Sequence, residues 1–225
     1  MPDSLIIALA NVRKSYNRGL VKALQDITLD FPARCFTALA GPSGSGKTTL
    51  LNIIGALDVP DAGSVSVDGC RLETLTENER TALRREKIGF IFQQFNLVPV
   101  LTACENVELP LEILPGYSRD ARLKAALDIL REVGLAGKEH RFPSELSGGE
   151  QQRVAVARAL VKKPIFVLAD EPTANLDGKT GRVIVELMKR MRDSLGTAFI
   201  LSTHDPRVIE QAETLVQLVD GRIDK

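Results

Sequence analysis

The loop Gly41–Thr48 carries the residue types and the spacing of a phosphate-binding loop. It reads GPSGSGKT and matches the pattern G-x-x-x-x-G-K-[ST] at every fixed position. Glycines let successive backbone N–H groups converge on one anion, and the start of the following helix adds partial positive charge. Lys47 can place its charge on the β- and γ-phosphates, and the Thr48 hydroxyl can ligate Mg²⁺.

A glycine-rich turn that only joins a strand to a helix is the alternative interpretation. The complete match, between a predicted strand and an apolar helix, disfavours it. The loop therefore predicts a site for a nucleoside triphosphate with Mg²⁺. Its expected binding residues are Gly41, Pro42, Ser43, Gly44, Ser45, Gly46, Lys47, Thr48 and Thr49.

Two carboxylates, Asp170 and Glu171, follow the apolar run Ile165–Ala169. Ligands of open α/β sheets bind at the carboxyl ends of the strands. Because neighbouring residues of a strand point to opposite faces, we expect the two acids to do different jobs. Asp170 would orient Mg²⁺, and Glu171 would polarise the attacking water as a general base. A solvated acidic turn is the alternative, and the phosphate loop in the same chain disfavours it.

The two histidines receive different interpretations. His204 follows the predicted strand Thr197–Leu201 at the same sheet edge, where an imidazole can bind a γ-phosphate or hold the base and water in register. A lone histidine is usually incidental, but this position favours a functional role. His140 lies in a polar loop and is interpreted as incidental.

A second glycine cluster, Leu146–Arg153, opens another predicted helix. The Ser147 hydroxyl, the amides of Gly148 and Gly149 and the helix dipole can together bind an anion. The same residues can equally be a serine N-cap with permissive glycines. Residue chemistry leaves both interpretations open, because one domain has no obvious need for two phosphate sites.

Six motifs in order resemble those of the ATP-binding cassette (ABC) ATPases, and the resemblance covers nearly the whole chain. They are the Walker A loop Gly41–Thr48, the Q-loop glutamine Gln93, the signature Leu146–Gln151, the Walker B strand Ile165–Glu171, the D-loop Ala174–Asp177 and the switch histidine His204. The resemblance implies an ATPase that hydrolyses ATP to ADP and phosphate. It implies catalytic roles for Lys47, Gln93, Glu171 and His204, and metal ligands at Thr48, Gln93 and Asp170.

Further roles follow from the same resemblance. Tyr16 occupies the place of an aromatic that stacks on adenine. Cassettes of this family pair head to tail, so that each signature caps the nucleotide of the other copy. The residues expected to act in trans are Ser147, Gly148, Gly149 and Asp177. The resemblance therefore implies a homodimer that forms on ATP binding.

The stretches Phe92–Leu111 and Ala169–Asp177 resemble one subgroup, the bacterial lipoprotein-releasing, macrolide-efflux and cell-division ATPases. This implies a separate integral membrane subunit, export or mechanical transmission through it, and a peripheral place on the cytoplasmic side of the bacterial inner membrane. An ATPase that regulates cell-division or cell-wall enzymes through a membrane partner, without transport, is the alternative. A soluble cassette ATPase acting on DNA or ribosomes is disfavoured.

An apolar patch is expected in the loop that follows Gln93. It would comprise Phe95, Leu97, Val98 and Leu101. The patch can form a groove for a short cytoplasmic helix of the membrane subunit, or it can be ordinary packing. Both interpretations stay open.

Composition limits the classes of partner. The 225 residues contain 29 Lys plus Arg and 29 Asp plus Glu, and this balance argues against a nucleic-acid surface. The polar start Met1–Ser4 does not resemble a signal peptide, and no apolar run approaches the length of a bilayer span. The separated cysteines are interpreted as reduced core residues; they are Cys35, Cys70 and Cys104.

The elements that position these residues are predicted from hydrophobic period and capping signals. Short strands are expected at Leu5–Ala10, Ile27–Phe31, Cys35–Ala40, Val65–Val67, Ile88–Phe92, Ile165–Ala169, Thr197–Leu201 and Leu215–Val219. Helices are expected to begin near Thr76, Thr102, Ser118, Gly149, Lys179 and Pro206. The helix after Ser118 should bury Leu123, Leu127 and Leu130, and that after Lys179 should bury Val183, Leu187 and Met191.

The fold class is therefore α/β, a P-loop NTPase core with a mainly parallel sheet and right-handed crossovers. We expect an N-terminal antiparallel β subdomain and an inserted helical subdomain. The single domain would span residues 1–225, with a sheet-based core at 1–92 and 164–225 and helices at about 93–163.

Overall fold

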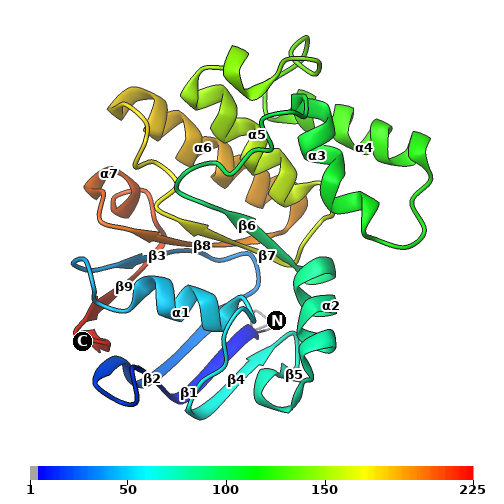
Figure 1. Ribbon diagram of the computed structural model, residues 1–225. Coiled ribbons are helices and arrows are strands. Elements are labelled where there is room, and N and C mark those ends of the chain that lie inside the picture. Colours follow the sequence, from blue (N-terminus) through cyan, green and yellow to red (C-terminus); the bar gives the residue numbers. More distant parts are fainter. Residues whose placement is uncertain (1–4, 225) are drawn as a thin grey trace.

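A six-stranded sheet forms the centre of the computed structural model, which describes residues 5–224 (Figure 1). Its strands are β3 (Phe36–Ala40), β6 (Ile88–Ile91), β7 (Phe166–Asp170), β8 (Ala198–Thr203), β9 (Thr214–Val219) and β10 (Arg222–Asp224). Their spatial order is β10-β9-β3-β8-β7-β6. All pair in parallel except β10, which is antiparallel to β9. Every residue of β3 and β8 is buried, as expected for strands covered on both faces.

A smaller antiparallel sheet lies below the central sheet. It contains β1 (Leu5–Tyr16), β2 (Val21–Pro32), β4 (Ala62–Val67) and β5 (Cys70–Arg71), in the order β2-β1-β4-β5. Helix α1 (Lys47–Ile54) runs between the two sheets (Figure 1). Its buried residues Leu50, Ile53 and Ile54 join the core that fills this space. A 3₁₀ turn (Leu72–Thr74) and α2 (Glu77–Lys87) lead back to the central sheet.

The remaining helices cover the other face of the central sheet. They are α3 (Ala103–Glu112), α4 (Arg119–Glu132), α5 (Gly148–Leu160), α6 (Gly178–Leu195) and α7 (Pro206–Ile209), with a 3₁₀ turn at Pro143–Glu145. The predicted starts at Thr76, Thr102 and Ser118 are confirmed, since each of these side chains accepts a hydrogen bond from the backbone N–H three residues later.

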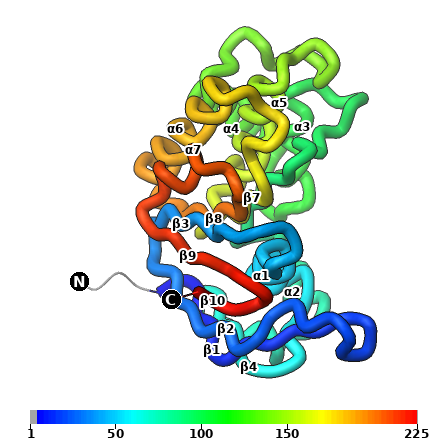
Figure 2. The backbone as a smooth tube through the Cα atoms, turned by 90° about the vertical axis from the view of Figure 1, so that its left-hand side faces the viewer, coloured from blue at the N-terminus to red at the C-terminus, as the bar shows by residue number. Residues whose placement is uncertain are grey.

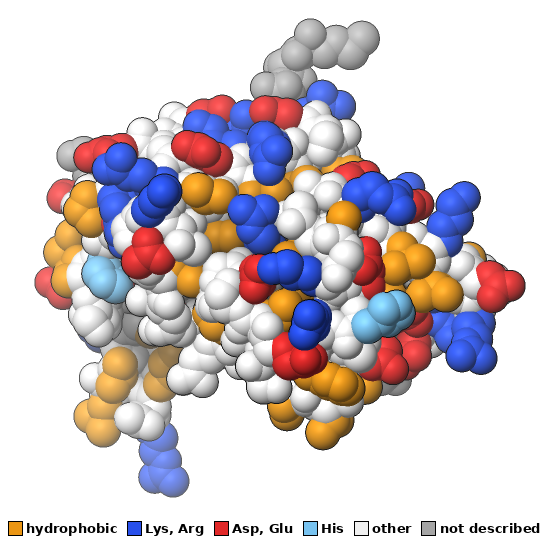
Figure 3. Space-filling model, turned by 90° about the horizontal axis from the view of Figure 1, so that it is seen from above, with side chains coloured by type: hydrophobic (Ala, Val, Ile, Leu, Met, Phe, Trp, Pro, Cys, Tyr) orange, Lys and Arg blue, Asp and Glu red, His pale blue; other side chains and the backbone are white. Residues whose placement is uncertain are grey.

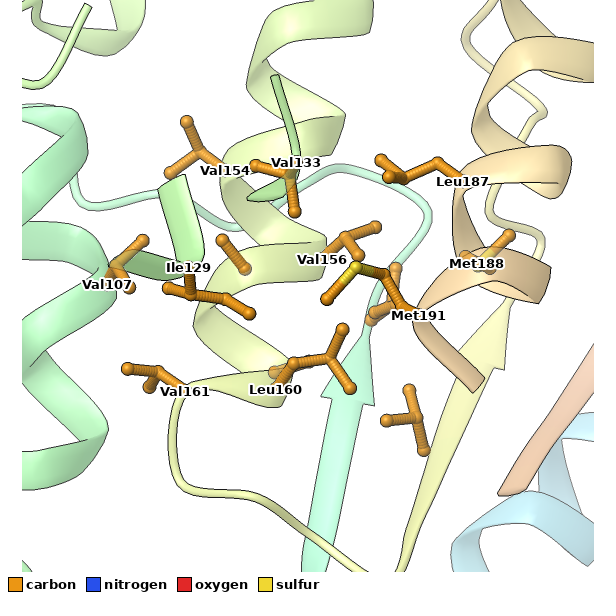
Figure 4. Packing of buried hydrophobic residues seen from close by; sticks show 14 of the residues in the cluster. Val107, Ile129, Val133, Val154, Val156, Leu160, Val161, Leu187, Met188 and Met191 are labelled. Atoms are coloured by element: carbon orange, nitrogen blue, oxygen red, sulfur yellow. The ribbon is translucent and has the colours of Figure 1, made fainter. Parts of the chain in front are cut away.

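Helix α5 is the centre of the upper core (Figure 4). Its residues Val156 and Leu160 lie between Ile129 of α4 and Met191 of α6, and all four belong to one buried cluster. The cluster continues into β6, β7 and β8. Helices α3 to α5 therefore share one hydrophobic core with the sheet, whereas the division into subdomains at residues 93–163 remains a prediction.

Several elements differ from the sequence predictions. Strand β1 continues past Ala10 to Tyr16, and β2 begins at Val21, so both strands are longer than predicted. The sequence did not reveal the extra length because register shifts between these strands interrupt the alternation of apolar residues that marks a strand. Asn11 and Asp26 have positive φ angles within these strands. Strands β5 and β10 are too short to give a periodic signal.

The buried faces of two helices also differ. In α4 the buried residues are Ala126, Ile129 and Leu130, while Leu123 is exposed. Val183 of α6 is likewise exposed. The rest of each predicted stripe is confirmed, since Leu130, Leu187 and Met191 are buried and Leu127 is partly buried against the same core.

The C-terminal strands lie against the N-terminal sheet (Figure 2). The Gln25 N–H of β2 donates to the Gly221 carbonyl at 2.7 Å. Cys35 and Cys104 are buried free thiols, but Cys70 is exposed on β5, so the prediction of three core cysteines was wrong for that residue. Among the described helices, none is both long and apolar enough to cross a membrane, and Met1–Ser4 lies outside the described residues.

Candidate functional site

A cavity of about 730 Å³ opens at the carboxyl ends of the parallel strands. The loops after β3, β6, β7 and β8 all reach it, because parallel strands end at the same edge of a sheet. The tip of the β1–β2 hairpin forms another wall. The cavity is lined by Tyr16, Val21, Lys22, Ala23, Pro42, Ser43, Gly44, Ser45, Gly46, Lys47, Thr48, Thr49, Gln93, Asp170, Glu171 and His204.

The phosphate loop is braced by segments far away in the sequence. A Cβ at Gly41 would lie 2.1 Å from the Leu218 carbonyl oxygen of β9, and one at Gly46 would lie 2.5 Å from the Ala23 carbonyl oxygen of β2. The Gly221 N–H, in the β9–β10 turn, donates to the Ser45 carbonyl at 3.0 Å. At Gly41 and Gly46 a side chain would collide with the backbone of a neighbouring strand, so only glycine fits. These contacts also explain why Gly41 does not line the cavity.

Two polar groups in the loop suit an anion. The Lys47 ammonium is buried and donates to the carbonyls of Gly41 at 2.8 Å and Pro42 at 3.0 Å. Ser45 Oγ is buried and has no hydrogen-bond partner among the described residues. Buried polar groups normally have partners, so this hydroxyl points to a ligand that supplies one.

The carboxylates of Asp170 and Glu171 reach the same cavity, although neighbouring residues of a regular strand point to opposite faces. Strand β7 ends at Asp170, and Glu171 has a φ of 46°, in the left-handed region. This backbone turn carries the second acid to the side of the first. The Glu171 N–H donates to the Ser202 carbonyl at 3.0 Å, which secures the turn to β8.

The two acids nevertheless have different partners. Asp170 Oδ2 lies 3.4 Å from the Thr48 hydroxyl, which donates to it, and the Ser202 hydroxyl donates to Oδ1. Glu171 Oε1 lies 2.7 Å from His204 Nδ1, a distance at which an Nδ1–H group donates to the carboxylate. Asp170 thus lies on the Thr48 side of the cavity and Glu171 on the His204 side. Ser202 is a partner of both residues, and no sequence signal indicated it.

Mg²⁺ is the metal that the oxygens of Thr48 and Asp170 would suit. Hydroxyl and carboxylate oxygens are ligands it prefers, and Mg²⁺ in nucleotide sites is held by one or two such groups together with phosphates. The described residues contain no cluster of three or more His, Cys, Asp or Glu side chains that could hold a metal ion.

The loop carrying Gln93 is fixed by two other elements. The Asn175 side-chain amide donates to the Gln93 carbonyl at 2.7 Å. The Arg158 guanidinium of α5 donates to the carbonyls of Phe95 at 2.7 Å and Asn96 at 2.5 Å. Both of these loop residues have positive φ angles near 50°. The Gln93 loop is therefore held in an unusual conformation by the helix and by the segment after β7, and Arg158 was missed by the sequence analysis.

The second glycine cluster does not belong to this cavity. None of its predicted residues lines the cavity, namely Ser147, Gly148, Gly149 and Asp177. Ser147 is exposed and caps α5, with Glu150 completing the capping box. The exposed Asp177 caps α6. These residues therefore present two helix N-termini to the surface.

The sequence of the chain is similar to those of known proteins. A family model described as ABC transporter matches residues 24–174, about two thirds of the chain. The chain belongs to the ABC transporter family. The ABC transporter ATP-binding protein MJ0796 of Methanocaldococcus jannaschii is 46% identical over 98% of this chain and 96% of its own. The lipoprotein-releasing system ATP-binding protein LolD of Bordetella pertussis is 45% identical over 93% of this chain and 91% of its own.

Solved structures of ABC cassettes confirm the predicted fold class and activity. The dimeric post-hydrolysis structure of MJ0796 bound to ADP and phosphate has a TM-score of 0.88 at 45% identity, covering 97% of each chain. The cbiO1 protein of Clostridium perfringens, part of the transporter complex cbiONQ, has a TM-score of 0.91 at 26% identity, covering 99% of this chain and 88% of its own. The chain is thus an ABC ATPase that binds nucleotide.

Proposed function

We propose that this ABC ATPase works as a homodimer that closes around ATP and Mg²⁺ and drives a separate integral membrane subunit. Its place would be peripheral, on the cytoplasmic side of the bacterial inner membrane. The observation that supports this most is the separation of the two proposed anion sites: the cavity holds the phosphate loop, while Ser147 and Asp177 are exposed outside it and Gly148 and Gly149 are partly exposed. A second copy, as in the dimeric MJ0796 structures, would bring them together.

The residues of the cavity suit the steps of hydrolysis. Tyr16 stacks on adenine. Lys47 exchanges the carbonyls of Gly41 and Pro42 for phosphate oxygens, which accept from it more strongly because they are charged. Glu171 takes a proton from the attacking water, and His204 holds that carboxylate in place.

Three further oxygen groups suit the metal. Mg²⁺ would be held by Thr48, Asp170 and Gln93, and when bound it neutralises charge on the phosphates. In trans, Ser147, Gly148 and Gly149 bind the γ-phosphate of the other copy, and Asp177 lies beside them.

We infer that the complex drives export, extrusion or mechanical transmission through the membrane subunit. The names of relatives such as LolD favour lipoprotein release as the specific process. Regulation of cell-division or cell-wall enzymes through a membrane partner is the second candidate. It is supported by the resemblance of Phe92–Leu111 to the subgroup that includes the cell-division ATPases. Over the face seen from above, positive and negative side chains are intermingled (Figure 3), which does not favour nucleic acid.

The membrane subunit would dock beside the Gln93 loop. The predicted patch residues Phe95, Leu97, Val98 and Leu101 are only half-exposed, and Leu97 packs against the upper core. The more exposed apolar residues nearby are Phe92, Val100 and Leu109. Of these, Phe92 lines a groove of about 220 Å³ whose other walls include Pro110, Arg158 and Lys162. We therefore place the partner's helix in this groove.

A substitution of Ser147 tests the proposed dimer. Ser147→Arg should leave ATP affinity of the monomer unchanged, because Ser147 does not line its own cavity. It should lower hydrolysis by about a hundredfold or more, as the loss of an oxyanion-type donor does. Ser144→Arg, an exposed change nearby, is the control and should leave both unchanged. Equal loss of ATP binding and hydrolysis in Ser147→Arg would place the signature in the same copy and contradict the dimer.

A further inference from the structure

The carboxylate of Asp58, in the loop after α1, holds the hydroxyl of Tyr16. Tyr16 is the last residue of β1, and its hydroxyl donates to Asp58 Oδ2 at 2.8 Å. The other oxygen, Oδ1, accepts from the Lys14 ammonium at 2.7 Å and from the Val59 N–H at 2.7 Å. One carboxylate thus joins the aromatic wall of the cavity to the segment that follows the phosphate-loop helix.

The bond to Tyr16 is not needed to satisfy a buried group. Lys14 is only 8% exposed, and a buried ammonium requires partners, which it finds in Asp58, in the Val59 carbonyl at 2.8 Å and in Asp61 at 3.6 Å. Tyr16 is 38% exposed, so its hydroxyl could bond to water instead. What the carboxylate adds is therefore the orientation of the ring.

The same network places a cation over the Tyr16 ring, which lines the cavity. The Lys14 ammonium lies over the Tyr16 ring, 5.3 Å from its centroid. An aromatic base can then stack on the opposite face. Burial and the bond to Asp58 raise the pKa of Tyr16, so the hydroxyl remains a donor at neutral pH. Burial alone would raise the pKa of Asp58, but the bonds from Lys14 and Tyr16 outweigh it and lower that pKa, so the acceptor remains charged.

We propose that Asp58 is a positioning residue for the nucleotide, which fixes the Tyr16 ring at the base-binding end of the cavity, and that Lys14 fixes Asp58. The inference rests on the proposed function, in which Tyr16 stacks on adenine. A ring that is already oriented loses less conformational freedom when the base stacks on it. The network therefore lowers the KM for ATP and leaves the hydrolytic step at Glu171 unchanged.

Steady-state kinetics of Tyr16→Phe and Asp58→Asn test the inference. Each should raise the KM for ATP by about fivefold, the effect of ordering one side chain, with kcat unchanged. The double variant should be no worse than either single variant, because both remove the same bond. Affinity for inorganic tripolyphosphate, which has no base, should not change. Asp61→Asn is the matched control, since Asp61 contacts Lys14 and the Ser15 N–H but not Tyr16, and its KM should equal that of the wild type.

Two outcomes would overturn the inference. One is an unchanged KM for ATP in Tyr16→Phe, and the other is an equal loss of tripolyphosphate affinity in both variants. If Asp58→Asn unfolds at assay temperature, Tyr16→Phe alone decides, because it leaves the Lys14–Asp58 pair intact. Tyr16→Ala separates this result from the proposed function: it should weaken ATP but not tripolyphosphate. If it does so while Tyr16→Phe is normal, stacking stands and only the role of Asp58 fails.

Discussion

The backbone of Glu171 determines how two neighbouring acids act in one cavity. In a regular strand one of the two side chains would point away from the ligand. The left-handed φ of Glu171 and its backbone bond to Ser202 bring both to the same side, with Thr48 beside Asp170 and His204 beside Glu171. Strain of this kind is commonly retained where function needs it. The pair of acids was evident in the sequence, but this turn was not.

At the residue scale, His204→Ala should separate binding from hydrolysis. His204 bonds to Glu171 at 2.7 Å and is otherwise exposed, so its loss should leave ATP affinity and thermal stability nearly unchanged. Hydrolysis should fall by about a hundredfold, because the carboxylate is no longer held toward the water. His140→Ala supplies the control, as the other exposed histidine. Normal turnover in His204→Ala would show that the bond to Glu171 has no part in the reaction.

At the scale of elements, strong local sequence signals were sufficient to predict helices and strands correctly. The capping boxes at Thr76 and Thr102, and the buried runs that became β3, β7 and β8, gave correct elements from the sequence. Bulged strands and short hairpins gave no such signal, and β10 was missed. Yet the turn before β10 supports the phosphate loop through Gly221 and Ser45. Contacts between segments some 175 residues apart have no local pattern that could predict them.

The N-terminus of α5 should make the protein's stability sensitive to acid. The Lys138 ammonium and the Ser147 N–H lower the pKa of Glu150 from 4.5 to about 2. Since the folded pKa is the lower one, these bonds stabilise the fold above about pH 4.5, and the contribution is lost as the pH falls through the folded value. Between about pH 6 and pH 3, Tm should therefore fall more in the wild type than in Glu150→Gln. Parallel Tm curves would rule out this contribution.

The proposed docking groove is also a property of elements, since residues of β6, α3 and α5 line it. Val100, beside the Gln93 loop, is 77% exposed, so Val100→Ser should alter stability by no more than about 0.5 kcal/mol. ATP hydrolysis by the isolated protein should be normal, while co-purification with the membrane subunit should decrease. Leu123→Ser, an exposed apolar change on α4, should not affect assembly. Full assembly of the Val100 variant would exclude the exposed side chain of Val100 from the interface.

At the scale of the whole molecule, the predicted site residues fall into two groups that lie in different places. The cavity brings together the phosphate loop, both acids, Gln93 and His204, while Ser147 and Asp177 cap helices outside it. Residue chemistry alone left the second glycine cluster ambiguous, because a single chain gives no reason for two anion sites. The resemblance to the cassette family suggested the answer, and the placement of these residues agrees with a partner copy that completes each site.

Light scattering of Glu171→Gln with saturating ATP would show whether two copies close around the nucleotide. The substitution keeps the size of the side chain and its contact with His204 but removes the base, so hydrolysis should slow by orders of magnitude while ATP remains bound. We expect a stable species of twice the 24.5 kDa monomer mass that reverts to monomer when ATP is removed. A variant that binds ATP fully and stays monomeric would contradict the proposed dimer.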